Sequence, residues 1–216
     1  MRQMRRQRGA TIIVVMMILV VITVLGIAAI RMGLTSLSIA TNSQINGLLF
    51  QSSDNGLISF EQRVLANPAA AALPDGAIGP ALNTPGIDIP FCVTKADRMR
   101  AGNCAAGTAA DFASARDAVV NQVAVFVPMG ADGSPLKSIV LGTDMDRAGI
   151  STYRVTVHST SVLPVFGSAT DADINGCFAL PSDDTENPAV VTVTDCLATE
   201  GAVFNTMMQE YDYGYN

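Results

Sequence analysis

The stretch GATIIVVMMILVVITVLGIAAI, from Gly9 to Ile30, decides how the rest of the chain is organised. The 21 residues from Ala10 to Ile30 contain no charged side chain, proline, asparagine or glutamine, and Arg8 and Arg31 flank the stretch. A helix of that length rises ~31 Å, which is about the thickness of the hydrocarbon core of a bilayer. The sequence therefore predicts a single membrane-spanning helix at residues 10–30.

The residues ahead of this stretch, MRQMRRQRG, hold four arginines and no acidic residue. Basic flanks stay on the cytoplasmic side of a membrane, so everything after Arg31 is expected on the other side. The chain has 216 residues and a net charge of −6, but the acidic residues all follow the leader. A strongly acidic exported part disfavours direct contact with nucleic acid.

All four cysteines, Cys92, Cys104, Cys177 and Cys196, lie in this exported part. An even number of cysteines in an oxidising compartment indicates two disulfides, for which three connectivities exist. We expect the sequential pairs Cys92–Cys104 and Cys177–Cys196, which close two short loops. A zinc site is the alternative, but the only histidine, His158, is remote in sequence from any cysteine pair.

Three interpretations of the N-terminus compete. The chain could carry an uncut signal anchor, or a secretory signal peptide cut near Gly26-Ile27-Ala28, although the apolar run is longer than the core of such peptides. In the third interpretation, cleavage falls between Gly9 and Ala10 and leaves the apolar helix at the mature N-terminus.

The third interpretation matches a known family. The run RQRGATIIVVMMILVVITVLGIAAIRMGLTSLSIATNSQ, residues 6–44, resembles the PilX-type minor pilins of type IV pili, and SATDADINGC and VTDCL in the distal part are similar to family members. The resemblance implies cleavage after Gly9 by prepilin peptidase, N-methylation of Ala10, and three parts: a leader 1–9, a helix 10–66 and a head 67–216. It also implies an inner-membrane protein whose head lies in the periplasm before assembly and at the cell surface afterwards. The implied partners are other minor pilins, the major pilin, a tip adhesin and the inner-membrane assembly platform.

One position departs from the general pilin pattern. Most pilins carry a glutamate five residues into the mature helix, and that position is Val14 here. A charge at membrane depth costs roughly 2.5–3.5 kcal/mol on insertion scales, so it must serve a purpose where it occurs. In pilins that glutamate is thought to reach the N-terminal amine of the subunit ahead. The hypothesis is that this chain sits at or near the tip, where no subunit lies ahead; the alternative is that Val14 is tolerated anywhere in a filament.

After the span, we expect the helix to continue without proline to Ala66, because Asn67-Pro68 forbids further helix. Gly26, Gly33, Gly47 and Gly56 interrupt it; they predict either bending, with Gly26–Gly33 as the segment that melts on assembly, or close helix packing. Residues 68–90 are expected to form a loop, and residues 92–104 a second loop.

Four later stretches with β-branched or alternating residues predict strands: 119–127, 136–141, 152–162 and 189–194. The predicted fold class is α+β, with the long helix packed on a four-stranded antiparallel sheet. The sequence Asp171-Ala172-Asp173-Ile174-Asn175-Gly176 matches the opening of a calcium loop, but its twelfth position is Ser182 instead of glutamate. We therefore expect an ordinary polar turn there. Calcium binding by Asp171, Asp173 and Asn175 is the weaker interpretation.

No catalytic motif occurs, so we expect neither enzymatic activity nor a cofactor. His158 falls in a predicted strand, as a surface or half-buried residue. The tyrosine-rich tail, Tyr211 to Tyr215, is expected either to pack on the head or to contact a partner. The predicted function is that of a structural minor pilin. The alternatives are a glutamate-lacking minor pseudopilin of type II secretion and a signal-anchored periplasmic binding domain.

Overall fold

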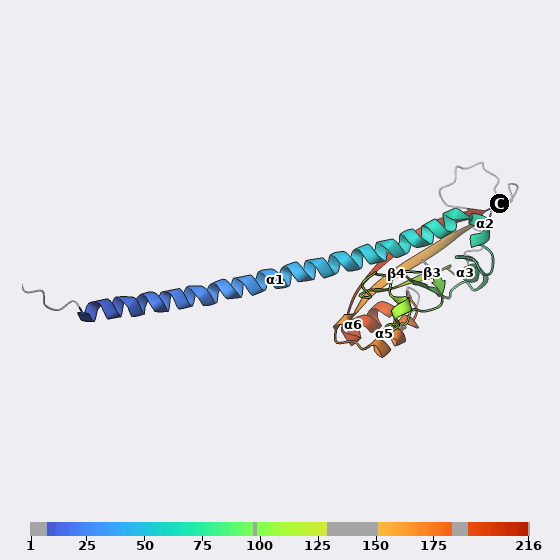
Figure 1. Ribbon diagram of the computed structural model, residues 1–216. Coiled ribbons are helices and arrows are strands. Elements are labelled where there is room, and N and C mark those ends of the chain that lie inside the picture. The colour runs from blue at the N-terminus through green and yellow to red at the C-terminus, as the bar shows by residue number, and fades with distance from the viewer. Residues whose placement is uncertain (1–7, 97–98, 129–150, 183–189, 216) are drawn as a thin grey trace, which may run out of the picture. The chain divides into compact units, whose positions relative to one another are not determined.

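The computed structural model describes residues 8–96, 99–128, 151–182 and 190–215 (Figure 1). The chain divides into two units, residues 1–46 and residues 47–216, and helix α1 (Arg8–Ala66) contributes to both. We refer to residues 47–216 as the head unit. The predicted end of the long helix at Ala66 is confirmed, because Asn67 caps a separate short helix, α2 (Pro68–Ala71).

The head unit is built on a five-stranded antiparallel sheet in the order β2-β1-β3-β4-β5. In chain order the strands are β1 (Ile89–Val93), β2 (Arg100–Ala101), β3 (Val120–Phe126), β4 (Ser151–Gly167) and β5 (Ala202–Tyr215). The predicted α+β class, a long apolar helix followed by an antiparallel sheet, is confirmed. Among the described residues the sheet has five strands, one more than predicted.

Two of the predicted strands, 119–127 and 152–162, correspond to β3 and β4. The prediction for 189–194 was wrong: helix α6 (Val193–Glu200) begins there, and the Thr192 side chain caps it by accepting from the backbone N–H of Asp195. The predicted strand 136–141 lies outside the described residues. Strand β5 was missed, because its residues were interpreted only as a tyrosine-rich tail.

Three segments predicted to be irregular contain regular structure. The loop predicted at 68–90 contains α2 and α3 (Gly79–Asn83) and the start of β1, and the loop predicted at 92–104 contains the end of β1 and all of β2. The polar turn predicted at 171–176 is instead part of helix α5 (Asp171–Phe178), because Thr170 and Asp173 form a capping box at its start. A short 3-10 helix, η1 (Ala109–Asp111), precedes β3.

Two hydrophobic clusters hold the head unit together. The first joins α1 to one face of the sheet through Leu57 and Phe60, which contact valines of β3 and β4. The second lies under α5 and α6, which Figure 1 shows side by side at one end of the sheet, and includes Ile174, Phe178 and Leu197. The sheet therefore carries α1 on one face and the α5–α6 pair on part of the other.

Candidate assembly surface

The first part of α1 exposes a continuous apolar surface. We call residues Ile12–Ile39 the apolar segment; its large side chains are 51–74% exposed, and the helix is long and apolar enough to cross a membrane, with a mean hydropathy of 3.2 in its most apolar window. None of that window is buried within the chain. Exposed apolar side chains in such number require either lipid or other protein to cover them.

The hydroxyl groups on this part of α1 are bonded to the backbone of their own helix. Thr23 Oγ1 donates to the carbonyl of Val20 at 2.8 Å, Thr35 Oγ1 to that of Arg31 at 2.9 Å, and Thr41 Oγ1 to that of Leu37 at 2.9 Å. In lipid, where no water satisfies polar groups, this arrangement lowers the cost of carrying a hydroxyl. These residues are therefore compatible with an apolar environment.

The residues of the predicted processing site lie at the start of this helix. Gly9 and Ala10 are in the first turn of α1, which begins at Arg8. Val14, the position where most pilins carry glutamate, lies one turn further on and is 55% exposed. The structure therefore places these residues on α1, whereas cleavage after Gly9 and methylation of Ala10 stay predictions.

A layer of polar side chains lies between the C-terminal part of α1 and the sheet; we call it the polar seam. Its members are Ser52, Ser53 and Gly56 of α1, Asn121 of β3, Ser159 of β4 and Asn205 of β5. Asn121 Nδ2 donates to the carbonyl of Ser52, and Ser159 Oγ donates to Asn121 Oδ1 at 3.2 Å. Ser53 Oγ donates to the carbonyl of Asn205 at 3.0 Å. Ser53, Asn121 and Ser159 are each 0% exposed, so these bonds fix where α1 lies on the sheet.

Gly56 allows α1 to approach the sheet closely at the polar seam. A Cβ atom at this position would overlap Ser159 Oγ and lie 2.9 Å from Asn121 Nδ2. No neighbour lies within 4 Å of a Cβ built on Gly26, Gly33 or Gly47. Of the two sequence interpretations of these glycines, close packing within the chain is thus found at Gly56.

Tyr211 of β5 lies against the same part of α1. Its ring centroid is 5.5 Å from that of Phe60, which is 1% exposed. Burial raises the pKa of Tyr211 to about 12, and the nearby Glu61 carboxylate adds to this shift. Tyr213 OH donates to the carbonyl of Pro68. Both tyrosines therefore pack on the head unit, which answers the question that the sequence left open for this part of the tail.

Two disulfides cross-link the head unit, and the pairs are the sequential ones, Cys92–Cys104 and Cys177–Cys196. The first ties β1 to the segment after β2. There Asp111, 5% exposed, accepts from Arg100 at 2.8 Å and from the backbone N–H of Ala105 at 2.8 Å. The second joins α5 to α6, so the last strand begins directly after a cross-linked helix pair.

The calcium-loop candidates lie in α5, and two of them, Asp173 and Asn175, make hydrogen bonds within the head unit. Asp173 bonds the side chain and backbone N–H of Thr170, and these bonds hold the pKa of its carboxyl below the usual value. Asn175 Oδ1 accepts from the backbone N–H of Ala106 at 2.6 Å. Among the residues that the structure describes, no three histidine, cysteine or acidic side chains are grouped as metal ligands. Residues 171–176 are helical and do not follow the path of a calcium loop.

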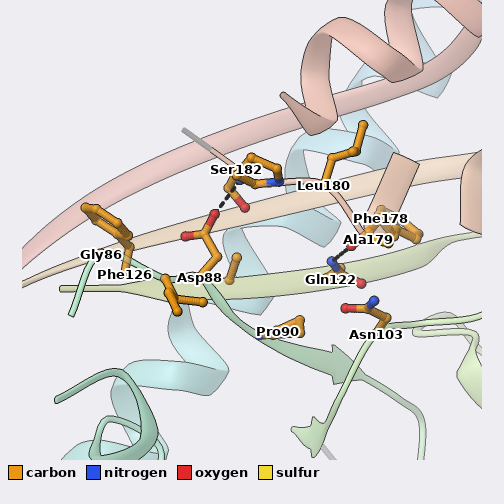
Figure 2. A pocket seen from close by; sticks show the side chains of 13 residues that line it. Gly86, Asp88, Pro90, Asn103, Gln122, Phe126, Phe178, Ala179, Leu180 and Ser182 are labelled. Atoms are coloured by element: carbon orange, nitrogen blue, oxygen red, sulfur yellow. Dashed lines mark hydrogen bonds between the residues drawn. The ribbon is translucent and has the colours of Figure 1, made fainter. Parts of the chain in front are cut away.

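The other residues singled out from sequence are dispersed. His158 lies on β4 and is 5% exposed, so the expectation of a surface or half-buried position was wrong. A hollow of about 250 Å³ lies beside α5, and Figure 2 shows the side chains that line it. There Asp88 accepts from the backbone N–H of Ser182, and Gln122 Nε2 donates to the carbonyl of Phe178. Gln122 Oε1 also accepts from the N–H of Cys104, so this amide links three segments of the chain. Its role here is structural.

The polar seam was missed from sequence. Its α1 members read as a polar interruption of the helix, SSDNG at residues 52–56, and Asn121 lies within a run of valines. A buried polar residue in a strand and a glycine late in a helix are each weak signals. Gly56 and Asn121 are 65 positions apart in sequence, and they form part of one polar layer only because the tertiary structure brings them together.

The comparisons with known proteins bear on the N-terminal part of the chain. No curated protein and no solved structure matches this chain. A family model described as PilX N-terminal matches residues 8–57, which is less than a quarter of the 216 residues. Over residues 8–57, which include the apolar segment and the whole α1 part of the polar seam, the predicted resemblance to PilX-type pilins is therefore confirmed.

Proposed function

We propose that this chain is a structural, non-catalytic minor pilin of a type IV pilus. The observation that carries the proposal is the match to the PilX N-terminal family over residues 8–57, whose apolar segment has no cover within the chain. Such a helix first serves as an anchor in the inner membrane. In a filament, the same side chains pack against the equivalent helices of neighbouring subunits, which replace lipid as their cover.

The proposal includes maturation at the start of α1. Prepilin peptidase cuts after Gly9, removes the leader 1–9 and exposes Ala10, whose amine is then methylated. The head unit lies in the periplasm before assembly and at the cell surface afterwards. Its partners are the major pilin, other minor pilins, a tip adhesin and the assembly platform of the inner membrane.

The N-terminus of the purified protein tests this maturation. Mass spectrometry of protein from membranes of a peptidase-positive strain is expected to give N-methylated Ala10, and a strain lacking prepilin peptidase is expected to keep Met1. Full-length protein in both strains contradicts the proposal and leaves a signal anchor, which suits a tethered periplasmic binding domain. A start near Met32 indicates a secretory signal.

We further propose that the subunit acts in assembly initiation, at or near the tip of the pilus. Support comes from Val14: a subunit with none ahead of it has no amine to neutralise, so valine avoids the cost of a buried carboxylate. Gold-labelled antibody against the head unit is expected to mark one end of sheared pili. Label along the whole length contradicts the tip position, and label only in a secretion-dependent structure indicates the type II pseudopilin.

A further inference from the structure

The two edges of the sheet differ in how well they are protected. One edge is β2, which has only two residues, Arg100 and Ala101, and is followed by Gly102. The other is β5, with 14 residues. Its register with β4 is continuous from Val203 to Tyr215, and the single irregularity lies at its very start, between Leu163 and Gly167 of β4. Sheet edges normally avoid further pairing by being short, bulged, or rich in proline and lysine.

Apart from the irregularity at its start and its two charged side chains, Glu210 and Asp212, strand β5 has none of these protections. It contains no proline and no lysine or arginine, and within the described residues the sheet order ends at β5. In an antiparallel pair, alternate residues of an edge strand direct both their N–H and C=O groups away from the partner strand. About half of β5 therefore presents a regular row of backbone donors and acceptors along its outer edge.

The side chains on this edge have a definite chemistry. One set of alternate residues packs toward α1, through the Asn205 bond to Ser53 and the Tyr211 contact with Phe60. The other set includes Met208, which is 56% exposed, followed by the exposed acids Glu210 and Asp212. This face of β5 therefore has one apolar position and two carboxylates two residues apart; Glu210 lies opposite Thr156 of β4, and Asp212 lies opposite Arg154.

We propose that the outer edge of β5 binds an extended strand of another polypeptide that carries two basic residues at alternate positions. The backbone groups of β5 supply the main-chain bonds, and Glu210 and Asp212 select lysine or arginine on the same face. A second copy of this chain is the poorer occupant, because its β5 brings two more carboxylates and no basic side chain. This inference concerns the head unit and does not depend on the proposed pilin function.

A peptide probe with symmetric sequence tests the proposal whichever way the strand runs. The probe is TVTVKVKVTVT, labelled with fluorescein, and binding to the full chain in an uncharged detergent is followed by fluorescence anisotropy, with empty micelles as the blank. The matched probe has glutamate at both lysine positions. Opposite charges on neighbouring strands attract and like charges repel, so the glutamate probe loses two attractions and gains two repulsions, and its binding is expected to be about fivefold or more weaker.

Backbone pairing is tested by N-methylation of alternate residues of the lysine probe. Only every second N–H of an added strand faces β5, so methylation of either the odd or the even residues must abolish binding, while the other set leaves it intact. Equal loss, or no loss, from both sets overturns strand addition.

Charge reversal on the protein supplies the second test. The double variant Glu210→Lys with Asp212→Lys is expected to reverse the preference and bind the glutamate probe more tightly. The control, Asp75→Lys with Glu200→Lys, makes the same change in net charge at exposed positions outside β5 and should keep the original preference. Reversal in the control, failure of both probes to bind, or dimerisation of the unliganded chain through β5 would overturn the proposal.

Discussion

The apolar segment of α1 and the head unit place their apolar side chains in opposite environments. In the apolar segment every large side chain from Ile12 to Ile39 is more than half exposed, and polar groups bond to their own helix. In the head unit the valines of β3 are buried, as are Val155, Val157 and Val162 of β4, and polar groups such as Asn121 bond across elements far apart in sequence.

The difference shows that the two parts of one helix can place different requirements on their sequences. A helical segment whose side chains are covered by lipid or by neighbouring subunits needs only an apolar composition and hydroxyl groups that bond to the helix's own backbone. A segment that is completed within its own chain needs particular residues at particular positions. Variants at α1 positions that are covered by the sheet and at α1 positions that are not should therefore have unequal effects on the head.

The largest difference is expected for two phenylalanines of α1. Phe60 is 1% exposed and Phe50 is 54% exposed. Phe60→Ala leaves a cavity between α1 and the sheet, so the free energy of unfolding of the head should fall by about 3–5 kcal/mol. Phe50→Ala should change it by less than about 1 kcal/mol. All four tyrosines follow residue 150, so tyrosine fluorescence during denaturation of the full chain in detergent reports on the head alone.

Loss of the disulfide between α5 and α6 is expected to have the second-largest effect on the stability of the head. Cys177 and Cys196 are 19 positions apart, and opening a loop of that size releases chain entropy in the unfolded state worth about 3 kcal/mol. The double variant Cys177→Ser with Cys196→Ser should lower the free energy of unfolding of the head by that amount. The same variant should leave the amount of protein in the membrane fraction unchanged, since the apolar segment has no cysteine. A fall in the amount of protein in the membrane fraction would contradict the expectation that the apolar segment inserts independently of the head.

The sequence predicted the apolar segment well because the cause of its structure is local. An uncharged run of 21 residues between arginines determines a helix without help from the rest of the chain. The end at Asn67-Pro68 is equally local, since proline cannot continue a helix. Strands β3 and β4 were found for a related reason: valine-rich alternation indicates a half-buried strand.

The distal helices and β5 were missed because their signals are ambiguous. Val193-Thr194 looks like a strand from side-chain type alone, whereas the cap at Thr192 and the bond to Cys177 through Cys196 favour the helix. Strand β5 contains Glu210 and Asp212, which are uncommon in strands, and its pairing with β4 is decided by tertiary structure. The polar seam was unpredictable for the same reason.

Two glycines of α1 should respond to alanine with opposite signs. A Cβ atom at Gly47 would have no neighbour within 4 Å, so Gly47→Ala should stabilise the helix by roughly 0.5–1 kcal/mol. Gly56→Ala places a methyl group against Ser159 Oγ, which must rotate away from Asn121 and lose its bond. We expect a net loss of about 1–3 kcal/mol.

The same denaturation series measures both glycine variants. The double variant Gly56→Ala with Ser159→Ala removes the obstructing hydroxyl and should recover part of the lost stability. If Gly56→Ala alone stabilises the head as Gly47→Ala does, then close approach at the polar seam does not determine how α1 docks.

The smallest effect is expected at Tyr211 and only at alkaline pH. Its pKa is raised from 10.0 to about 12, chiefly by burial, so the folded head holds the phenolic proton after the unfolded chain has released it. The unfolded state then binds fewer protons, and the stability present below pH 10 falls as the pH rises from 10 to about 12. Tyr211→Phe keeps the ring against Phe60 and removes the titrating group, so its stability should fall less over this range while matching the parent at pH 7. If Tyr211→Phe and the parent lose the same stability between pH 10 and about 12, then groups other than Tyr211 cause the loss.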